Sequence, residues 1–219
     1  MVQYFFEVMR VNVIDMVLNI YRKVGIEVIK YDEDSITKEL NQLMKEVDDI
    51  PPEKVKEELS RRREYIEDIK VDPLQALVIT VELMSDVITE ITGDEGKGHI
   101  FTSLILVSHP QVNDFMLLTG GVTPQSLFLL SEMFARKLFK GSNIEKAKKT
   151  VKEAVSDRKV LLRALIEATY KLMDQIARTT LSSVNDVVAS ATMYLHRLVI
   201  ETKKKLYTVD MKKIYGGVM

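Results

Sequence analysis

The sequence contains no cysteine and no tryptophan, and its only histidines are His99, His109 and His196. The absence of cysteine excludes disulfides, thiolate metal sites and a cysteine nucleophile. It also removes the usual sign of a secreted, oxidised protein, so we expect an intracellular, cytoplasmic location. Asparagine and glutamine number only six each against 29% charged residues, a balance typical of proteins from thermophiles.

The sequence also predicts neither a signal peptide nor a membrane span. Residues 1–20 have no basic region before their apolar stretch, and polar residues interrupt that stretch. Between residues 98 and 131 only Asp114 carries a formal charge, but Pro110 and Pro124 divide the segment into pieces too short to cross a bilayer. We therefore expect a buried helical hairpin there and a soluble protein.

Charge is present in both signs but unevenly divided along the chain. Residues 1–132 carry 13 Lys and Arg against 24 Asp and Glu, whereas residues 133–219 carry 18 against 8. The two parts have charges near −11 and +10 within a total of −1. This asymmetry indicates either a surface that faces a polyanion or head-to-tail contacts between copies of the chain.

The apolar residues, 46% of the chain, recur at helical spacing almost throughout. The pattern predicts an all-α, multi-helix bundle of about eight helices that ends in a long antiparallel helical hairpin, formed by residues 160–179 and 181–206. One helix is expected to begin after Asp34 or Ser35, and another to run from Pro52 to about Lys70. The pattern fits two helical regions, an acidic region at residues 1–96 and a region at residues 97–219 whose carboxy-terminal half is basic. It also fits a single domain.

The most apolar predicted helix follows Asp72 and Pro73 and should lie at the centre of the core. It is expected to end in a loop from Gly93 to Gly98, with the next helix beginning near Ile100. The loop resembles a phosphate cradle only in composition, because Gly98 stands where a P-loop needs Ser or Thr and no strand precedes it. An ordinary helix-ending loop is the better interpretation.

Three acids, Glu82, Asp86 and Glu90, recur every fourth residue and so share one face of this central helix. A di-metal site would need Glu-x-x-His pairs, and none occurs in the sequence. We therefore predict no metal and no cofactor, and expect the row to be a solvated face or a docking strip for the basic carboxy-terminal part.

No catalytic motif accompanies the three histidines. A Gly-x-Ser-x-Gly elbow is missing, so His99 and His109 are predicted to be core or loop residues, and His196 a surface residue. Residues 111–138 have the outline of a helix-turn-helix, but the second helix opens with apolar side chains rather than with groups that read base edges.

Basic residues are the strongest functional signal, and they form two clusters suited to phosphate contacts. The predicted nucleic-acid-binding residues are Lys140, Lys146, Lys148, Lys149, Lys152, Arg158 and Lys159 in the first cluster, and Arg197, Lys203, Lys204, Lys205, Lys212 and Lys213 in the second. The alternative is a lysine-rich solvated surface of a heat-adapted protein.

Together these features favour a non-enzymatic structural or assembly protein that forms homo-oligomers, binds nucleic acid through its basic part, or does both. The first alternative is a sequence-specific DNA-binding regulator that uses residues 111–138. The second is a helical enzyme of a type that its motifs do not reveal. No small-molecule substrate is indicated by the sequence.

Overall fold

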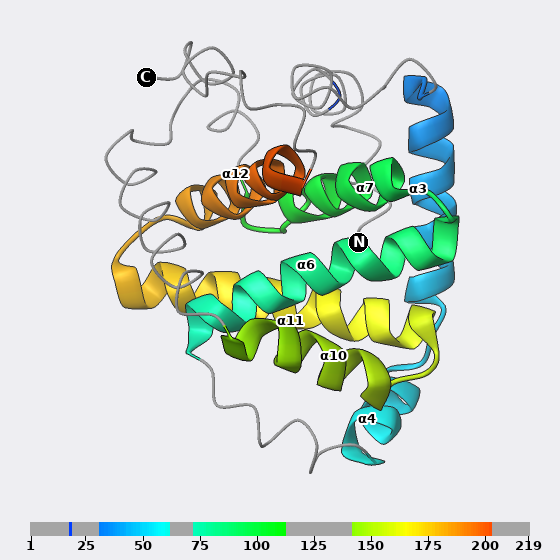
Figure 1. Ribbon diagram of the computed structural model, residues 1–219, viewed down its shortest axis with the longest axis horizontal. Coiled ribbons are helices and arrows are strands. Elements are labelled where there is room, and N and C mark those ends of the chain that lie inside the picture. The colour runs from blue at the N-terminus through cyan, green and yellow to red at the C-terminus, as the bar shows by residue number, and fades with distance from the viewer. Residues whose placement is uncertain (1–17, 19–30, 62–71, 113–141, 203–219) are drawn as a thin grey trace.

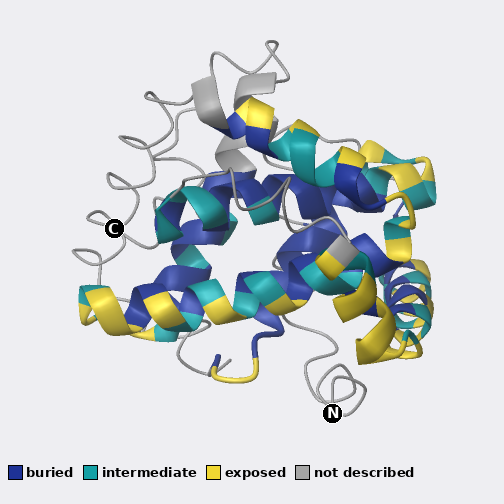
Figure 2. Ribbon diagram, turned by 90° about the horizontal axis from the view of Figure 1, so that it is seen from below, coloured by how far each residue is buried: buried dark blue, intermediate teal, exposed yellow. Residues whose placement is uncertain are grey.

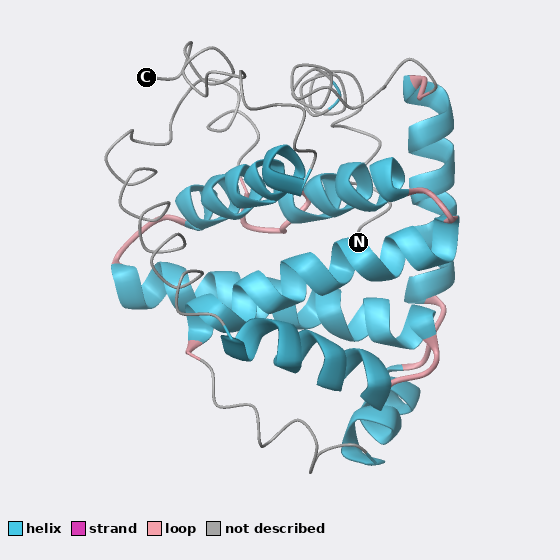
Figure 3. Ribbon diagram, in the orientation of Figure 1, coloured by secondary structure: helices cyan, strands magenta, loops and turns pink. Residues whose placement is uncertain are grey.

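The computed structural model describes residue 18 and residues 31–61, 72–112 and 142–202. In these residues the prediction of an all-α bundle is confirmed, because they form seven α-helices and no strand (Figure 3). The helices are α3 (Glu33–Asp48), α4 (Pro52–Arg61), α6 (Pro73–Thr92), α7 (Glu95–Val107), α10 (Ser142–Ala154), α11 (Arg158–Thr180) and α12 (Val184–Thr202).

Helix α6 lies at the centre of the bundle, as its apolar sequence predicts, and packs against α7, α10, α11 and α12 (Figure 1). Its start is fixed by a capping box, in which the Asp72 carboxylate accepts from two backbone N–H groups and Gln75 accepts from the Asp72 N–H. Its end is fixed by Gly93, whose φ of 68° is the left-handed conformation that glycine adopts without strain.

Helix α7 begins earlier than the sequence predicted, at Glu95 rather than near Ile100. The expectation of a loop up to Gly98 gave too much weight to the glycines and too little to Asp94, which caps the first turn. Gly98 is buried where α7 crosses α6, and a β-carbon there would lie 2.7 Å from the carbonyl oxygen of Ser85. This glycine therefore permits the close approach of two helices.

Helices α3 and α4 cover one side of α11. Helix α3 begins at Glu33, slightly earlier than predicted, because the side chain of Asp32 caps it by accepting from the Ser35 N–H at 2.8 Å. Arg163 of α11 donates to the carbonyl oxygens of Val47, Asp48 and Ile50 at the end of α3. These carbonyls lie at or just after the last turn of α3, where the helix supplies fewer backbone donors, so this one guanidinium ties α3 to α11.

The predicted carboxy-terminal hairpin is confirmed. Helices α11 and α12 run in opposite directions and pack against each other, joined by Leu181, Ser182 and Ser183 (Figure 1). Leu181 has a left-handed φ of 54° and ends α11. The predicted end of the hairpin at residue 206, the helix extension from 62 to 70 and the helix-turn-helix outline beyond residue 112 lie outside the described residues.

Each described helix carries buried residues along part of its length (Figure 2), and the apolar ones among them form a core. Phe101, Leu77 and Leu162 are among its members with no exposed surface. The boundary between the two predicted regions, at residues 96 and 97, falls within the first turn of α7. In the part of the chain described here, no helix combines the length and the apolar character that crossing a membrane requires.

Candidate functional site

The acidic row of α6 lies against α10, and its charges are matched there. The ammonium group of Lys148 is 2.6 Å from Glu82 and 3.5 Å from Asp86. One turn further along both helices, Glu90 pairs with Lys152 and with Arg158, whose Nε lies 2.6 Å from the carboxylate. The prediction of a docking strip for the basic part of the chain is therefore confirmed.

The hydrogen bond from Lys152, together with the charges of Lys152 and Arg158, lowers the pKa of the Glu90 carboxyl although partial burial acts against it. Glu90 is therefore ionised at neutral pH. Because the acids of α6 and the lysines Lys148 and Lys152 of α10 recur every four residues, Lys148 meets the first two acids and Lys152 meets the third.

Glu82 is the buried member of the row, with 8% of its surface exposed. It accepts a hydrogen bond of 2.6 Å from Lys148 and another of 2.5 Å from the hydroxyl of Tyr194 on α12. Burial opposes the charge of Lys148, but the hydrogen bond that Lys148 donates to Glu82 and the charges of Glu82, Asp86 and Glu145 outweigh it and raise the lysine pKa. Three helices are thus joined through one carboxylate.

A second polar contact joins α6 to α7. The hydroxyl of Ser85 lies 3.0 Å from Nδ1 of His99, and Nε2 of His99 lies 3.8 Å from a carboxylate oxygen of Glu95. The order Ser–His–Glu resembles that of a catalytic triad. However, Glu95 is 62% exposed and too distant for a hydrogen bond, and Ser85 stands within a helix whose backbone N–H groups are engaged. The contact with Ser85 therefore holds the His99 ring in place and does not activate the Ser85 hydroxyl as a nucleophile.

These side chains surround a pocket of about 630 Å³ between α6, α7, α10 and α12. Besides the charged residues already named, its lining includes Ser85, Thr89, His99, Ile144, Tyr194 and Leu195. The pocket is therefore bordered by acids and lysines along α6 and α10, by the Ser–His contact on one wall, and by two apolar side chains.

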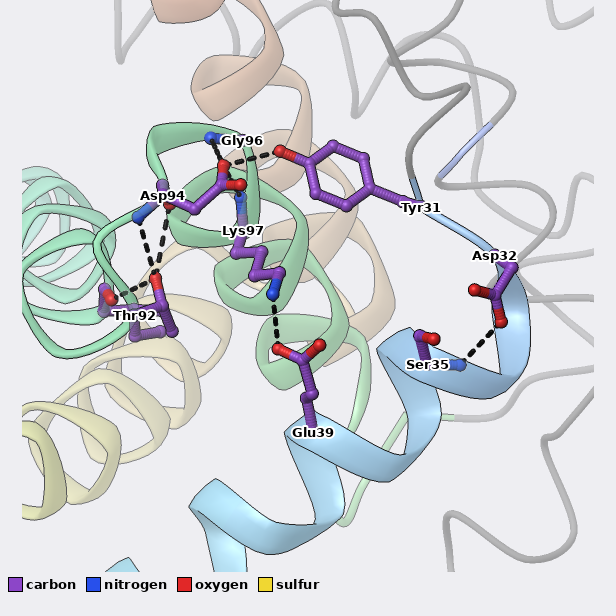
Figure 4. A network of polar contacts seen from close by, with 9 residues as sticks. Tyr31, Asp32, Ser35, Glu39, Thr92, Asp94, Gly96 and Lys97 are labelled. Carbon is purple, nitrogen blue, oxygen red and sulfur yellow. Dashed lines mark hydrogen bonds and ion pairs between the residues drawn. The ribbon is translucent and has the colours of Figure 1, made fainter.

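The segment from Gly93 to Gly98, which resembles a phosphate cradle in composition, holds the start of α7 against Tyr31 and α3 (Figure 4). The Asp94 carboxylate accepts from the N–H groups of Gly96 and Lys97, and from the hydroxyl of Tyr31 at 2.5 Å. Lys97 pairs with Glu39 of α3 at 2.5 Å. The N–H groups and the lysine that a phosphate would need are thus occupied, although Glu95 to Gly98 form the first turn of α7 rather than the expected loop.

His109 is a core residue, as predicted, with 2% of its surface exposed. Its Nδ1 accepts from the Gln111 N–H at 3.1 Å, which places the proton of the neutral ring on Nε2. Nε2 faces the carbonyl oxygen of Tyr170 at 3.4 Å and a carboxylate oxygen of Asp174 at 3.5 Å. The tautomer is consistent with a structural role at the end of α7.

Five of the six described basic residues in the first predicted cluster make ion pairs within the chain. Lys148, Lys152, Arg158 and Lys159 pair with acids from residues 1–132, and Lys149 pairs with Glu153 at 3.8 Å on its own helix. Lys146 is exposed and forms no ion pair with any described residue. The predicted residues outside the described part, or with undescribed side chains, are Lys140, Arg197, Lys203, Lys204, Lys205, Lys212 and Lys213.

The sequence analysis did not identify two residues of the site, Ser85 and Tyr194. Ser85 lies three residues after Glu82, so helical spacing already places it beside the acidic row. Tyr194 gave no such signal, because its partner Glu82 is 112 residues away in the chain.

Comparison with protein-family models, with curated proteins and with solved structures found no match for this chain.

Proposed function

We infer that this chain is a non-enzymatic structural or assembly protein that binds nucleic acid through basic residues of its carboxy-terminal part. The supporting observation is the charge balance left after the helices have packed. Residues 133–219 contain 18 Lys and Arg. Four of them pair with acids of residues 1–132 in the described part, and the other 14 still outnumber the eight acids of residues 133–219.

The pairing also changes which residues are expected to contact phosphate. Lys148 is only 15% exposed and already bonded to a buried carboxylate, so releasing it for a phosphate would leave Glu82 uncompensated. Lys146 is exposed and forms no ion pair with a described residue, and the second predicted cluster, from Arg197 to Lys213, has no described side chains. The proposed interface therefore excludes the α6–α10 contact and is centred on the second cluster.

Affinity for duplex DNA as a function of salt tests this function. We expect binding of two unrelated duplexes with similar affinity, and a linear decrease of log affinity with log salt, because each phosphate contact releases counterions. The measurement is fluorescence anisotropy of labelled duplexes. Absence of binding at low salt would refute the proposal, and a strong preference for one sequence would favour the DNA-binding regulator instead.

Self-association through unlike charges is the second part of the proposed function. Part of the complementarity between acidic and basic regions is used inside one chain, so contacts between copies would depend on the remaining exposed acids and lysines. We expect the average mass in solution to be higher at low salt than at high salt. Light scattering measures that mass, and a value independent of salt would count against charge-driven assembly.

A further inference from the structure

The pocket beside the acidic row is a groove lined by α6, α7, α10 and α12. At this groove the Ser85–His99 contact joins α6 to α7, and the Glu82–Lys148 pair joins α6 to α10. Tyr194 of α12 donates to Glu82 in the same lining. A volume of about 630 Å³ falls within the range that accommodates small organic ligands.

The groove has more negative than positive charge. Its lining contains two lysines, Lys148 and Lys152, against five carboxylates, those of Glu82, Asp86, Glu90, Glu95 and Glu145. Arg158 adds a third cation at Glu90, which leaves two negative charges in excess. A concave site with this balance attracts cations and repels anions.

Lys148 shows what kind of cation the groove accommodates. A primary ammonium group there lies 2.6 Å from Glu82, 3.5 Å from Asp86 and 3.7 Å from Glu145. The first two carboxylates are one helical turn apart, so a single ammonium bridges them. The groove already holds one alkylammonium group supplied by the protein itself.

Three carboxylates of the groove are exposed to solvent and have their cationic partners at 3.5 Å or more. Asp86 is 44% exposed, Glu145 is 79% exposed, and Glu95 is 62% exposed with His99 as its partner at 3.8 Å. The charges of the α6 row alone extend over about 12 Å, the rise of eight residues of helix. Ile144 and Leu195 also belong to the lining, with 4% and 0% of their surfaces exposed.

We propose that the groove between α6, α7, α10 and α12 binds an aliphatic di- or polyamine. The ammonium groups pair with the exposed carboxylates of Asp86, Glu95 and Glu145, and the carbon chain spans the groove between these carboxylates. The groove lining contains none of the residues on which the proposed nucleic-acid interface is centred, so each proposal is tested without the other.

Isothermal titration calorimetry with spermidine as the probe tests the site. We expect saturable binding that weakens with salt, and a roughly tenfold weaker affinity for the variant Glu95→Gln/Glu145→Gln, because exposed ion pairs each contribute up to about 1 kcal/mol. The matched control is Glu53→Gln/Glu153→Gln, which removes the same charge from exposed carboxylates outside the groove. It should retain the affinity within about twofold. All four side chains are exposed, so the fold is expected to persist, which circular dichroism verifies.

Three results would overturn the proposal. No saturable binding of spermidine to the natural sequence would exclude the site. Equal losses in the two double variants would show attraction to acidic surface in general rather than to the groove. Equal competition by Mg²⁺ at the same concentration would show that charge alone, and not the shape of an alkylammonium ion, determines binding.

Discussion

At the scale of single residues, the buried carboxylate of Glu82 connects α6, α10 and α12. Its two hydrogen-bond partners, Lys148 and Tyr194, come from parts of the chain far from α6 in sequence. Burying a charge is costly unless its partners compensate it, so each contact depends on the other. The residue therefore acts as a junction of three helices.

Replacing Lys148 with methionine tests this junction. We expect Lys148→Met to lower the free energy of unfolding by about 3 kcal/mol, because it leaves a buried carboxylate without its cation. Adding Glu82→Gln should recover about half of the loss, since the uncompensated charge is then gone. Urea denaturation measures both values.

The control is Lys149→Met, on the same helix but 76% exposed, which should change the stability by no more than about 0.5 kcal/mol. Similar losses for Lys148→Met and Lys149→Met would mean that the contact of Lys148 with Glu82 contributes little.

His109 gives the described fold a dependence on pH. Burial lowers its pKa below 6.5, against the opposing charge of Asp174 and the hydrogen bond to the Tyr170 carbonyl. The folded protein then binds fewer protons at this ring than the unfolded chain does. Stability from the neutral ring is complete above pH 6.5 and is lost as the pH falls from 6.5 towards the folded pKa.

We expect the free energy of unfolding of the natural sequence to decrease below pH 6.5 by up to about 1.4 kcal/mol per pH unit on account of this ring. In His109→Asn that contribution should vanish, although the variant is less stable at neutral pH. Denaturation curves between pH 8 and pH 5 give both slopes. Identical slopes for the two proteins would show that His109 does not titrate as described.

At the scale of the helices, sequence and structure agree where local chemistry determines the result. The capping box at Asp72, Pro73 at the first turn and Gly93 after the last turn specify α6 without any tertiary information. The spacing of Glu82, Asp86 and Glu90 likewise indicated a docking strip, because helical periodicity alone places them on one face. The pairing of these acids with Lys148 and Lys152 of α10 follows from the complementary charges of the two helices.

Other features could not be predicted from the sequence because they depend on tertiary packing. The start of α7 was misplaced since Gly96 and Gly98 read as loop residues, whereas Gly98 serves the approach to Ser85 and Thr89 of α6. The contact of Tyr194 with Glu82 joins residues 112 positions apart and has no local signature. The Ser85–His99 contact likewise requires the crossing of α6 and α7.

A substitution at Gly98 tests that crossing. We expect Gly98→Ala to destabilise the protein by about 2 kcal/mol, because the added methyl group would meet backbone as well as the Thr89 side chain, which outweighs the higher helix propensity of alanine. Gly96→Ala is the control, since its methyl group would meet the Tyr31 hydroxyl and Asp94 carboxylate, side-chain ends that shift more easily. Thermal unfolding compares them, and a larger loss for Gly96→Ala would contradict the account.

At the scale of the whole molecule, the division of charge along the chain has two consequences. Part of the basic region neutralises acids of the first region inside the bundle, through Lys148, Lys152, Arg158 and Lys159. The second cluster is proposed to supply the contacts to nucleic acid. The predictions of heat adaptation, oligomerisation and a cytoplasmic location rest on composition and remain predictions.

The central claim is therefore that lysines bonded within the bundle and lysines of the second cluster differ in function. The most direct measurement is the slope of log affinity for duplex DNA against log salt in two double variants with the same charge change. Lys204→Gln/Lys205→Gln should reduce the magnitude of the slope by about two, as expected for two lost phosphate contacts. Lys152→Gln/Lys159→Gln should leave the slope unchanged. A reduction confined to the second variant, or equal in both, would contradict the account.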